Sequence, residues 1–399
     1  MPVRFGQEIQ AVLRSRDMIP RGFSFSAINV GIKSPAYTKL DLGLVACTTD
    51  VVLSGVFTRN LVKAAPVLIG MEQVKRGSAR AVIANAGNAN ACTGSIGVSD
   101  ARAMMEAVAR ELKVSPDEVV PMSTGTIGVH LPTERIIPEI PRLVKGLSQD
   151  PEPFARSIMT TDTFPKMVHR RVGEACILGF AKGAGMIAPN MATTLAVVLT
   201  DAVVDKQDLD NIIKNSVGHT FNAITVDGDM STNDTLVACS SGLVEADPSE
   251  FRYAMDEVIA GLARMIVQDG EGATKFVTVK VDGAGSDRDA KVIAMAVANS
   301  LLVKTAIFGA DPNWGRIVSA VGYAGVKVDP REIAVRIQGL DVVEGGIQAR
   351  SFTDSSLHDA LTNKEIAIDI TVGAGQGRFM VWTTDLSHKY VEINAQYRT

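Results

Sequence analysis

The stretch Lys182-Gly-Ala-Gly-Met-Ile-Ala-Pro189-Asn-Met-Ala-Thr193-Thr194 leads directly into the apolar run Leu195-Ala-Val-Val-Leu199. An uninterrupted apolar run of this length is typical of a strand that is buried on both faces of a sheet. Gly183 and Gly185 allow close backbone approach, and the Pro-Asn pair at 189–190 favours a turn just before the strand. The sequence therefore predicts a buried strand that begins beside two hydroxyl-bearing residues.

Thr193 is the candidate nucleophile of this stretch. If the chain were cut between Ala192 and Thr193, one residue would carry both a hydroxyl nucleophile and an α-amino base. An α-amino group, with a typical pKa of about 7.7–8, accepts a proton near neutral pH. The alternative interpretation is a threonine selected only for its β propensity. Because Thr194 offers a second hydroxyl, the residues alone leave the attacking group open.

The bulk composition is that of a globular enzyme. The chain has 399 residues, 46% of them hydrophobic and 21% charged, and its length allows two domains or one large layered domain. The net charge of −4, without a basic block, argues against a nucleic-acid partner or an acidic membrane surface. No stretch reaches membrane-spanning length and residues 1–8 resemble no export signal, so we expect a cytoplasmic protein.

The cysteines and histidines point away from disulfides and metals. Cys47, Cys92, Cys176 and Cys239 are scattered, which predicts buried, reduced thiols. The five histidines never occur at metal-ligand spacing, so we expect no metal site.

Strand and helix patterns alternate along the chain, which predicts an α/β or α+β fold of layered sheets and helices. Ser115-Pro-Asp-Glu118 predicts a capped short helix ending near Pro121, and Pro132–Pro141 a loop or a broken helix. Gly373-Ala-Gly-Gln-Gly377 lacks the spacing and the following helix of a dinucleotide loop. The remaining expected elements are helices at about 99–113, 207–220, 249–267 and 289–304, and strands at 81–84, 276–281, 333–337, 366–372 and 379–384.

Several polar loops could carry chemistry. Ser123-Thr124-Gly125-Thr126 could aim backbone N–H groups and a hydroxyl at an oxyanion, although a plain turn is the alternative. The loop Asn85–Gly94 offers either substrate-facing amides or side chains that satisfy their own backbone. Glu271 could meet a cationic ligand or lie as a solvated charge at a helix end.

The acidic loop Asp227–Asp234 imitates a calcium loop at its first four ligand positions. Thr232 stands where the turn needs glycine, and Ala238 stands where the closing glutamate belongs. We therefore predict no calcium site in this loop.

These segments together resemble one family along nearly the whole chain. Lys182–Thr193 is similar to the self-cleavage segment of the ornithine acetyltransferases (glutamate N-acetyltransferases) of arginine biosynthesis. Blocks in the same order include Val62–Pro66, Asn85–Gly94, Ser123–Gly125, Thr160–Thr163, Asp269–Gly272, Phe308–Arg316 and Tyr390–Thr399. Because many blocks share one order, the resemblance is highly specific.

The resemblance implies a precursor that cuts itself between Ala192 and Thr193 into an α chain (1–192) and a β chain (193–399). It implies Thr193 as nucleophile and Thr124 with Gly125 as the oxyanion hole. The implied substrate contacts are Thr160, Lys182, Thr193, Glu271, Asn394 and Thr399, with Thr161 an alternative to Thr160.

The implied reaction moves an acetyl group from N2-acetyl-L-ornithine to L-glutamate through an acetyl-Thr193 ester. Acetyl-CoA is a further donor that the sequence leaves open, and no other cofactor is expected. The implied fold is N-terminal-nucleophile-like, with a second, smaller α/β region toward the C-terminus. The implied assembly is a heterotetramer of two α and two β chains. A hydrolase of related architecture and a non-catalytic binding protein are the alternative functions.

Overall fold

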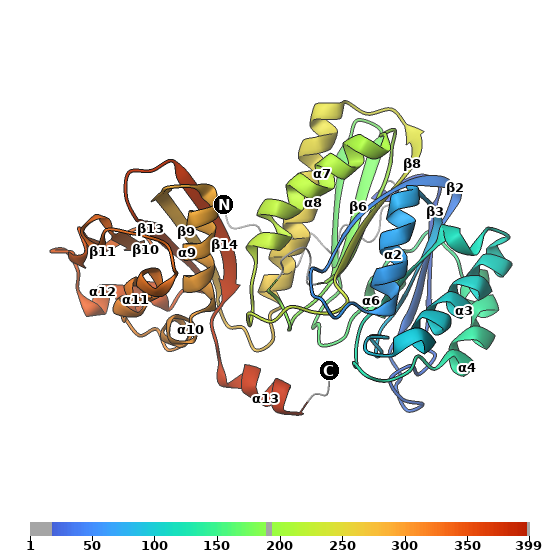
Figure 1. Ribbon diagram of the computed structural model, residues 1–399, viewed down its shortest axis with the longest axis horizontal. Coiled ribbons are helices and arrows are strands. Elements are labelled where there is room, and N and C mark those ends of the chain that lie inside the picture. The colour runs from blue at the N-terminus through green and yellow to red at the C-terminus, as the bar shows by residue number, and fades with distance from the viewer. Residues whose placement is uncertain (1–17, 189–193, 397–399) are drawn as a thin grey trace.

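The computed structural model describes residues 18–188 and 194–396, which form two lobes of sheet and helix (Figure 1). The predicted site residues Ala192, Thr193 and Thr399 lie outside the described residues. The layered α/β fold class is confirmed, and so is the smaller α/β region toward the C-terminus.

The large lobe is built on an eight-stranded sheet in the order β4-β3-β2-β8-β7-β6-β5, with β1 paired to β2. Its strands are β1 (Phe23–Ile28), β2 (Leu42–Phe57), β3 (Ser78–Asn85), β4 (Val119–Ser123), β5 (Lys166–Val172), β6 (Ala175–Lys182), β7 (Leu195–Ala202) and β8 (Thr235–Val244). Its helices are α2 (Ala65–Arg76), α3 (Gly94–Leu112), α4 (Thr133–Ile136), α5 (Ile140–Lys145), α6 (Glu152–Ser157), α7 (Lys206–His219) and α8 (Pro248–Gln268).

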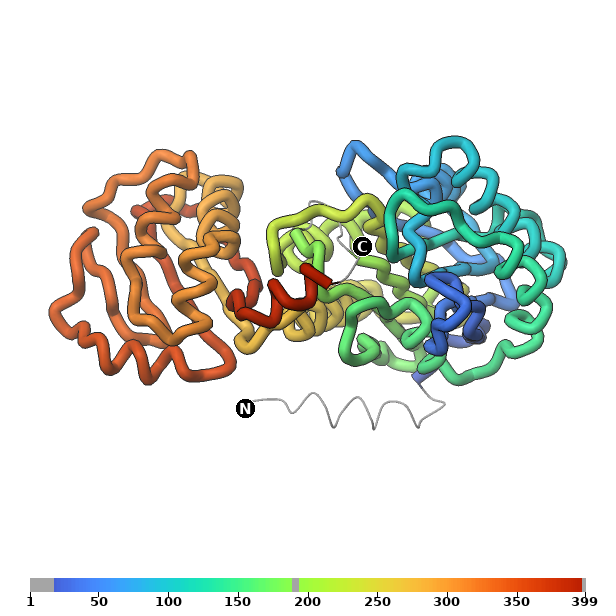
Figure 2. Tube along the Cα trace, turned by 90° about the horizontal axis from the view of Figure 1, so that it is seen from below, coloured from blue at the N-terminus to red at the C-terminus, as the bar shows by residue number. Residues whose placement is uncertain are grey.

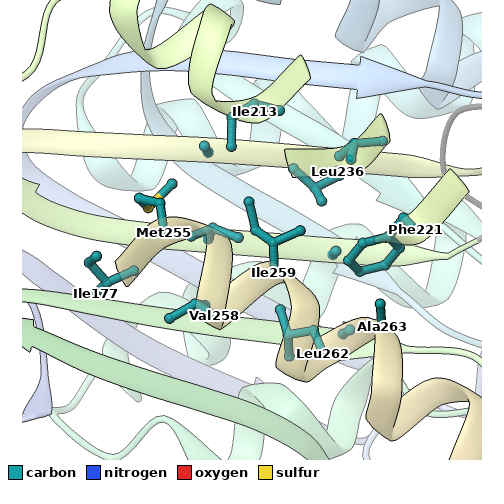
Figure 3. Close-up of a cluster of buried hydrophobic side chains, with 14 of the residues drawn as sticks. Ile177, Ile213, Phe221, Leu236, Met255, Val258, Ile259, Leu262 and Ala263 are labelled. Carbon is teal, nitrogen blue, oxygen red and sulfur yellow. The ribbon is translucent and has the colours of Figure 1, made fainter. Parts of the chain in front are cut away.

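The central strand β7 is buried on both faces, as its apolar run predicts. Ala196 and Val198 pack in one core cluster with α7 and α8, whereas Val197 and Leu199 pack in a second cluster. Figure 3 shows the first cluster, where side chains of α8 such as Ile259 meet the sheet and the short helix at Phe221. Because successive residues of a strand point to opposite faces, an all-apolar strand joins both clusters.

The small lobe carries a six-stranded sheet in the order β12-β11-β10-β13-β9-β14. Its strands are β9 (Phe276–Ala284), β10 (Ala334–Ile337), β11 (Leu340–Glu344), β12 (Ile347–Gln348), β13 (Glu365–Thr371) and β14 (Gly377–Thr384). Its helices are α9 (Asp287–Asn299), α10 (Leu301–Phe308), α11 (Gly315–Tyr323) and α12 (Asp354–Leu361). The last helix, α13 (His388–Gln396), leaves this lobe and runs toward the large lobe (Figure 2).

Most predicted helices and strands are present with shifted ends, and three predictions need correction. The helix predicted at 289–304 is broken, because Ser300 is extended and its side chain caps the next helix, α10. The capped helix at Ser115 has its capping box but is one 3-10 turn, Pro116–Glu118, since Val119–Ser123 pairs with β3 as strand β4. Cys92 is exposed, unlike the other three cysteines, and lies with φ of 57° in the loop before α3.

The proline cluster at 132–141 is a broken helix, with α4 and α5 separated by a 3-10 turn. Among the described residues no single helix is long and apolar enough to cross a membrane. One bent pair, α9 with α10, would pass on length and composition alone.

Candidate active site

One pocket of about 250 Å³ brings together all of the predicted site residues that the structure describes. They come from segments far apart in the chain and are Thr124, Gly125, Thr160, Lys182, Glu271 and Asn394. Thr161 also lines the pocket, so both threonines of that pair face it. Thr194, the residue after the predicted nucleophile, lines the pocket as well.

The Thr124-Gly125 loop follows β4 and is held by the end of β3. The Thr124 N–H donates to the Asn85 carbonyl at 2.9 Å, and the Ser123 hydroxyl donates to Asn85 Oδ1 at 2.6 Å. Gly125 has φ of 132°, and a Cβ there would lie 2.3 Å from the backbone carbon of Gly87. The loop therefore needs glycine at position 125, which leaves its backbone close to the pocket.

The asparagine loop after β3 mainly satisfies backbone groups. Asn88 Nδ2 donates to the carbonyls of Val129 and His130, and Asn90 Nδ2 donates to the Gly97 carbonyl. Both side chains are buried and are absent from the pocket lining. Of the two interpretations of this loop, the structure supports the one in which it supports its own backbone.

Lys182 places a buried ammonium group at the end of β6. Its side chain is 9% exposed, and its Nζ donates to the Thr124 hydroxyl at 3.3 Å. Within the described part of the chain, no carboxylate lies within 4 Å of this Nζ. Burial lowers the pKa of Lys182, while Asp162 and more distant carboxylates oppose that shift. A buried ammonium with so few partners favours an anionic ligand.

An ion chain of three buried side chains lies behind the pocket. Lys166 Nζ contacts Asp162 Oδ1 and Asp269 Oδ2 at 2.6 Å each. Asp162 also accepts the N–H groups of Thr160 at 2.9 Å and Gly183 at 2.7 Å. This ion chain therefore fixes the backbone of Thr160 and of Gly183, the residue after Lys182. The sequence did not predict this role.

Glu271 lies two residues beyond Asp269 and points into the pocket. Its side chain is 9% exposed, so the alternative of a solvated helix-end charge is wrong. Its Oε2 accepts a hydrogen bond from Asn394 Nδ2 at 2.8 Å. A Cβ at Gly185 would lie 2.3 Å from Oε2, which means that the glycine-rich stretch makes room for this carboxylate.

The acidic loop Asp227–Asp234, for which the sequence predicts no calcium site, also lines the pocket. The sequence did not predict this role. Asp227, Asp229 and Asp234 line the pocket together with polar neighbours. Asp234 is 2% exposed, and burial raises its pKa well above the ordinary value despite hydrogen bonds from Ser231 and Thr58. Among the described residues, no three His, Cys, Asp or Glu side chains are grouped so that they could hold a metal ion.

Comparison with known proteins identifies the family. The ArgJ family model matches residues 24–399. The chain belongs to the ArgJ family. It is 49% identical over 393 residues to the arginine biosynthesis bifunctional protein ArgJ of Geobacter sulfurreducens, covering 95% of this chain and 99% of the relative. The protein of the same name from Syntrophotalea carbinolica is 44% identical over 390 residues, with 95% and 99% covered.

Two solved structures are also similar. The arginine biosynthesis bifunctional protein argJ of Bacillus halodurans is 38% identical, with a TM-score of 0.48 over 50% of this chain and 98% of that chain. The ornithine acetyltransferase of Mycobacterium tuberculosis, solved with ornithine, is 38% identical, with a TM-score of 0.40 over 45% of this chain and 98% of that chain.

The predicted family and enzyme class are confirmed by this membership. The chain is an acetyltransferase enzyme of arginine biosynthesis. Family membership therefore sets aside the alternative of a non-catalytic binding protein.

The ion chain predicts how stability depends on pH. Although burial alone would raise it, the ammonium groups of Lys166 and Lys182 hold the pKa of Asp162 at about 2. Its folded pKa is depressed, so its stabilisation is full above about pH 4 and is lost as the pH falls toward 2, a change of about 2 kcal/mol. Chemical unfolding from pH 6 to 2 measures this. Asp162→Asn should flatten the acid limb, whereas Asp359→Asn, an exposed residue, should keep it.

The Gly125 loop predicts a selective loss of activity. Gly125→Ala drives a methyl group into the Gly87 backbone. On the predicted oxyanion role of this loop, we expect acetyl transfer to fall about 10²- to 10³-fold, the usual effect of losing one such donor. Gly128→Ala is the matched control, because Gly128 has φ of 80° but no atom within 4 Å of its Cβ. Equal kcat values for the two variants would contradict the tight-loop argument.

Proposed function

We propose that the enzyme transfers the acetyl group of N2-acetyl-L-ornithine to L-glutamate through an ester on Thr193. The observation that carries the proposal is the convergence of Thr124, Gly125, Lys182 and Glu271 on one pocket whose wall includes Thr194. Thr194 is covalently joined to Thr193, so the proposed nucleophile is one residue from that wall.

The chemistry assigns one task to each group. The Thr193 hydroxyl attacks the acetyl carbonyl and the α-amine of the same residue takes its proton. Thr124 and a backbone N–H at Gly125 hold the oxyanion, for which one donor is typically worth about 2.7–4 kcal/mol. Ornithine leaves with the proton, and the α-amine of glutamate then takes the acetyl group, giving N-acetylglutamate and free Thr193.

Binding of the donor follows from the charges in the pocket. The buried Lys182 ammonium suits the α-carboxylate, since it lacks a close carboxylate among the described residues. Glu271 suits the δ-ammonium, which would share its carboxylate with Asn394. Asp227 and Asp229 add negative charge to the same pocket and favour a cationic donor. Thr160 and Thr399 complete the proposed set of contacts.

Self-cleavage uses the same hydroxyl once before catalysis. The Thr193 hydroxyl attacks the Ala192 carbonyl carbon, the C–N bond breaks, and the hydroxyl proton moves to the nitrogen. Water then hydrolyses the ester and yields chains 1–192 and 193–399. Support comes from the sheet, because β6 precedes the cut, β7 follows it, and their antiparallel ladder would keep the two chains together. We further propose that two α and two β chains form a heterotetramer.

Replacement of Thr193 tests both roles of the hydroxyl. Wild-type enzyme should give two fragments near half the chain each on a denaturing gel, and Thr193→Ala should give one intact band with no acetyl transfer. Mass spectrometry after incubation with acetylornithine should find the acetyl adduct on the fragment that begins at Thr193. Active protein with an intact chain would contradict the proposal.

The acceptor and the donor are tested by product analysis. Incubation with acetylornithine should give N-acetylglutamate when glutamate is present and little acetate without it. Acetate release independent of glutamate would instead support the hydrolase alternative. We propose acetyl-CoA as a second donor because the curated relatives are named bifunctional. The matching assay supplies acetyl-CoA and glutamate alone, and absence of N-acetylglutamate there would restrict the enzyme to acetylornithine.

A further inference from the structure

Asp227 lines the pocket, and both oxygens of its carboxylate accept hydrogen bonds from backbone N–H groups. Its Oδ2 accepts the Met186 N–H at 2.6 Å and its Oδ1 accepts the Ile187 N–H at 2.8 Å. The Asp229 N–H donates to the same Oδ1 at 3.2 Å. Asp227 therefore clamps two successive amides of the turn that follows Gly185.

The clamped turn has an unfavourable backbone conformation. Met186 has φ of 57°, a left-handed value that a side chain such as methionine rarely adopts. The Ile187 carbonyl is held from the other side, since it accepts the Val226 N–H at 2.7 Å and the Thr225 hydroxyl at 3.0 Å. A residue stays in such a conformation only where contacts with the surrounding structure hold it there. The contacts from residues 225–227 therefore set the direction in which the chain leaves Ile187.

The C-terminal helix α13 reaches the same carboxylate. The Tyr390 hydroxyl donates to Asp227 Oδ2 at 3.3 Å. Burial raises the pKa of Tyr390, and the negative charges of Asp227 and Glu271 raise it further, so the hydroxyl remains a donor at neutral pH. One turn along the helix, Asn394 donates to Glu271. Two residues on one face of α13 thus bind two different pocket carboxylates.

The start of α13 is fixed by polar contacts to the segment that connects α8 to β9. The Ser387 hydroxyl donates to the Gly272 carbonyl at 2.5 Å, and Asp385 accepts the N–H groups of Thr274 and Lys275. Gly272 has φ of 70°, and a Cβ there would lie 2.4 Å from the Tyr390 nitrogen. None of the described side chains of α13 is buried, so polar contacts dominate its docking.

We propose that Asp227 is a positioning residue for self-cleavage, and that its contact with Tyr390 makes cleavage depend on docking of the C-terminal helix. The inference rests on the proposed cut between Ala192 and Thr193. Ile187 lies five residues before Ala192 in the sequence, and on this proposal the direction of the held turn affects the rate of cleavage. The precursor then cuts itself efficiently only after its last residues have been made and docked.

The rate of precursor cleavage in full-length variants tests this inference. An amide at position 227 can accept from only one of the two clamped N–H groups, so Asp227→Asn should slow the appearance of the two fragments about tenfold. Tyr390→Phe removes one hydroxyl donor and should slow it about threefold. Tyr253→Phe, on the exposed side of α8, is the matched control and should cleave at the wild-type rate.

Stability is measured separately, in the Thr193→Ala background where no chain is cut. Tyr390→Phe should keep the midpoint of thermal unfolding within about 2 °C, whereas Ile259→Val in the core should lower it. With Thr193 intact, Ile259→Val should still cleave at the wild-type rate. Cleavage of Asp227→Asn and Tyr390→Phe at the wild-type rate would overturn this inference and leave the proposed self-cleavage standing. An intact wild-type chain would contradict the proposed self-cleavage together with it.

Discussion

The site depends on the buried ion chain of Asp162, Lys166 and Asp269. All three side chains are almost fully excluded from solvent, so each charge is costly unless the others stay in place. The chain joins β5 to the segment before it and to the end of α8. From these places it fixes the backbone of Thr160 and Gly183 and the loop that carries Glu271. This ion chain thus sets the positions of Thr160, Lys182 and Glu271 around the pocket.

The described lining of the pocket has more acidic side chains than basic ones, and these ionisable groups differ in what they bind. Lys182 is a buried cation that hydrogen-bonds only a neutral hydroxyl among the described residues, whereas several carboxylates line the same pocket. Of these, Asp227 accepts backbone amides and the Tyr390 hydroxyl. Among the described residues Glu271 accepts only a side-chain amide, which a ligand ammonium could complement. The acidic groups therefore divide between building the pocket and meeting the substrate.

Local patterns of apolar residues predicted secondary structure well where one face of a helix or a whole strand is buried. The helices α3, α7 and α8 and the strand β7 have such patterns, and each lies where its periodicity indicated. The pattern failed at Ser300, because the apolar spacing continues while a serine cap turns the chain through 56°. It failed again at Val119–Ser123, where parallel pairing with β3 outweighs the helical start at Ser115.

The sequence by itself determined which chemical groups are available: the Thr193 hydroxyl at a predicted turn, the glycines around Lys182, and the order of segments that marks the family. Only the tertiary structure decided which of them meet. Glu271 could be read as a solvated charge until folding buried it, and Asp227 could be read as part of a failed calcium loop until it clamped Met186. Burial and hydrogen bonding between distant segments are properties of the folded chain, because no local spacing encodes how residues 41 or 123 positions apart come into contact.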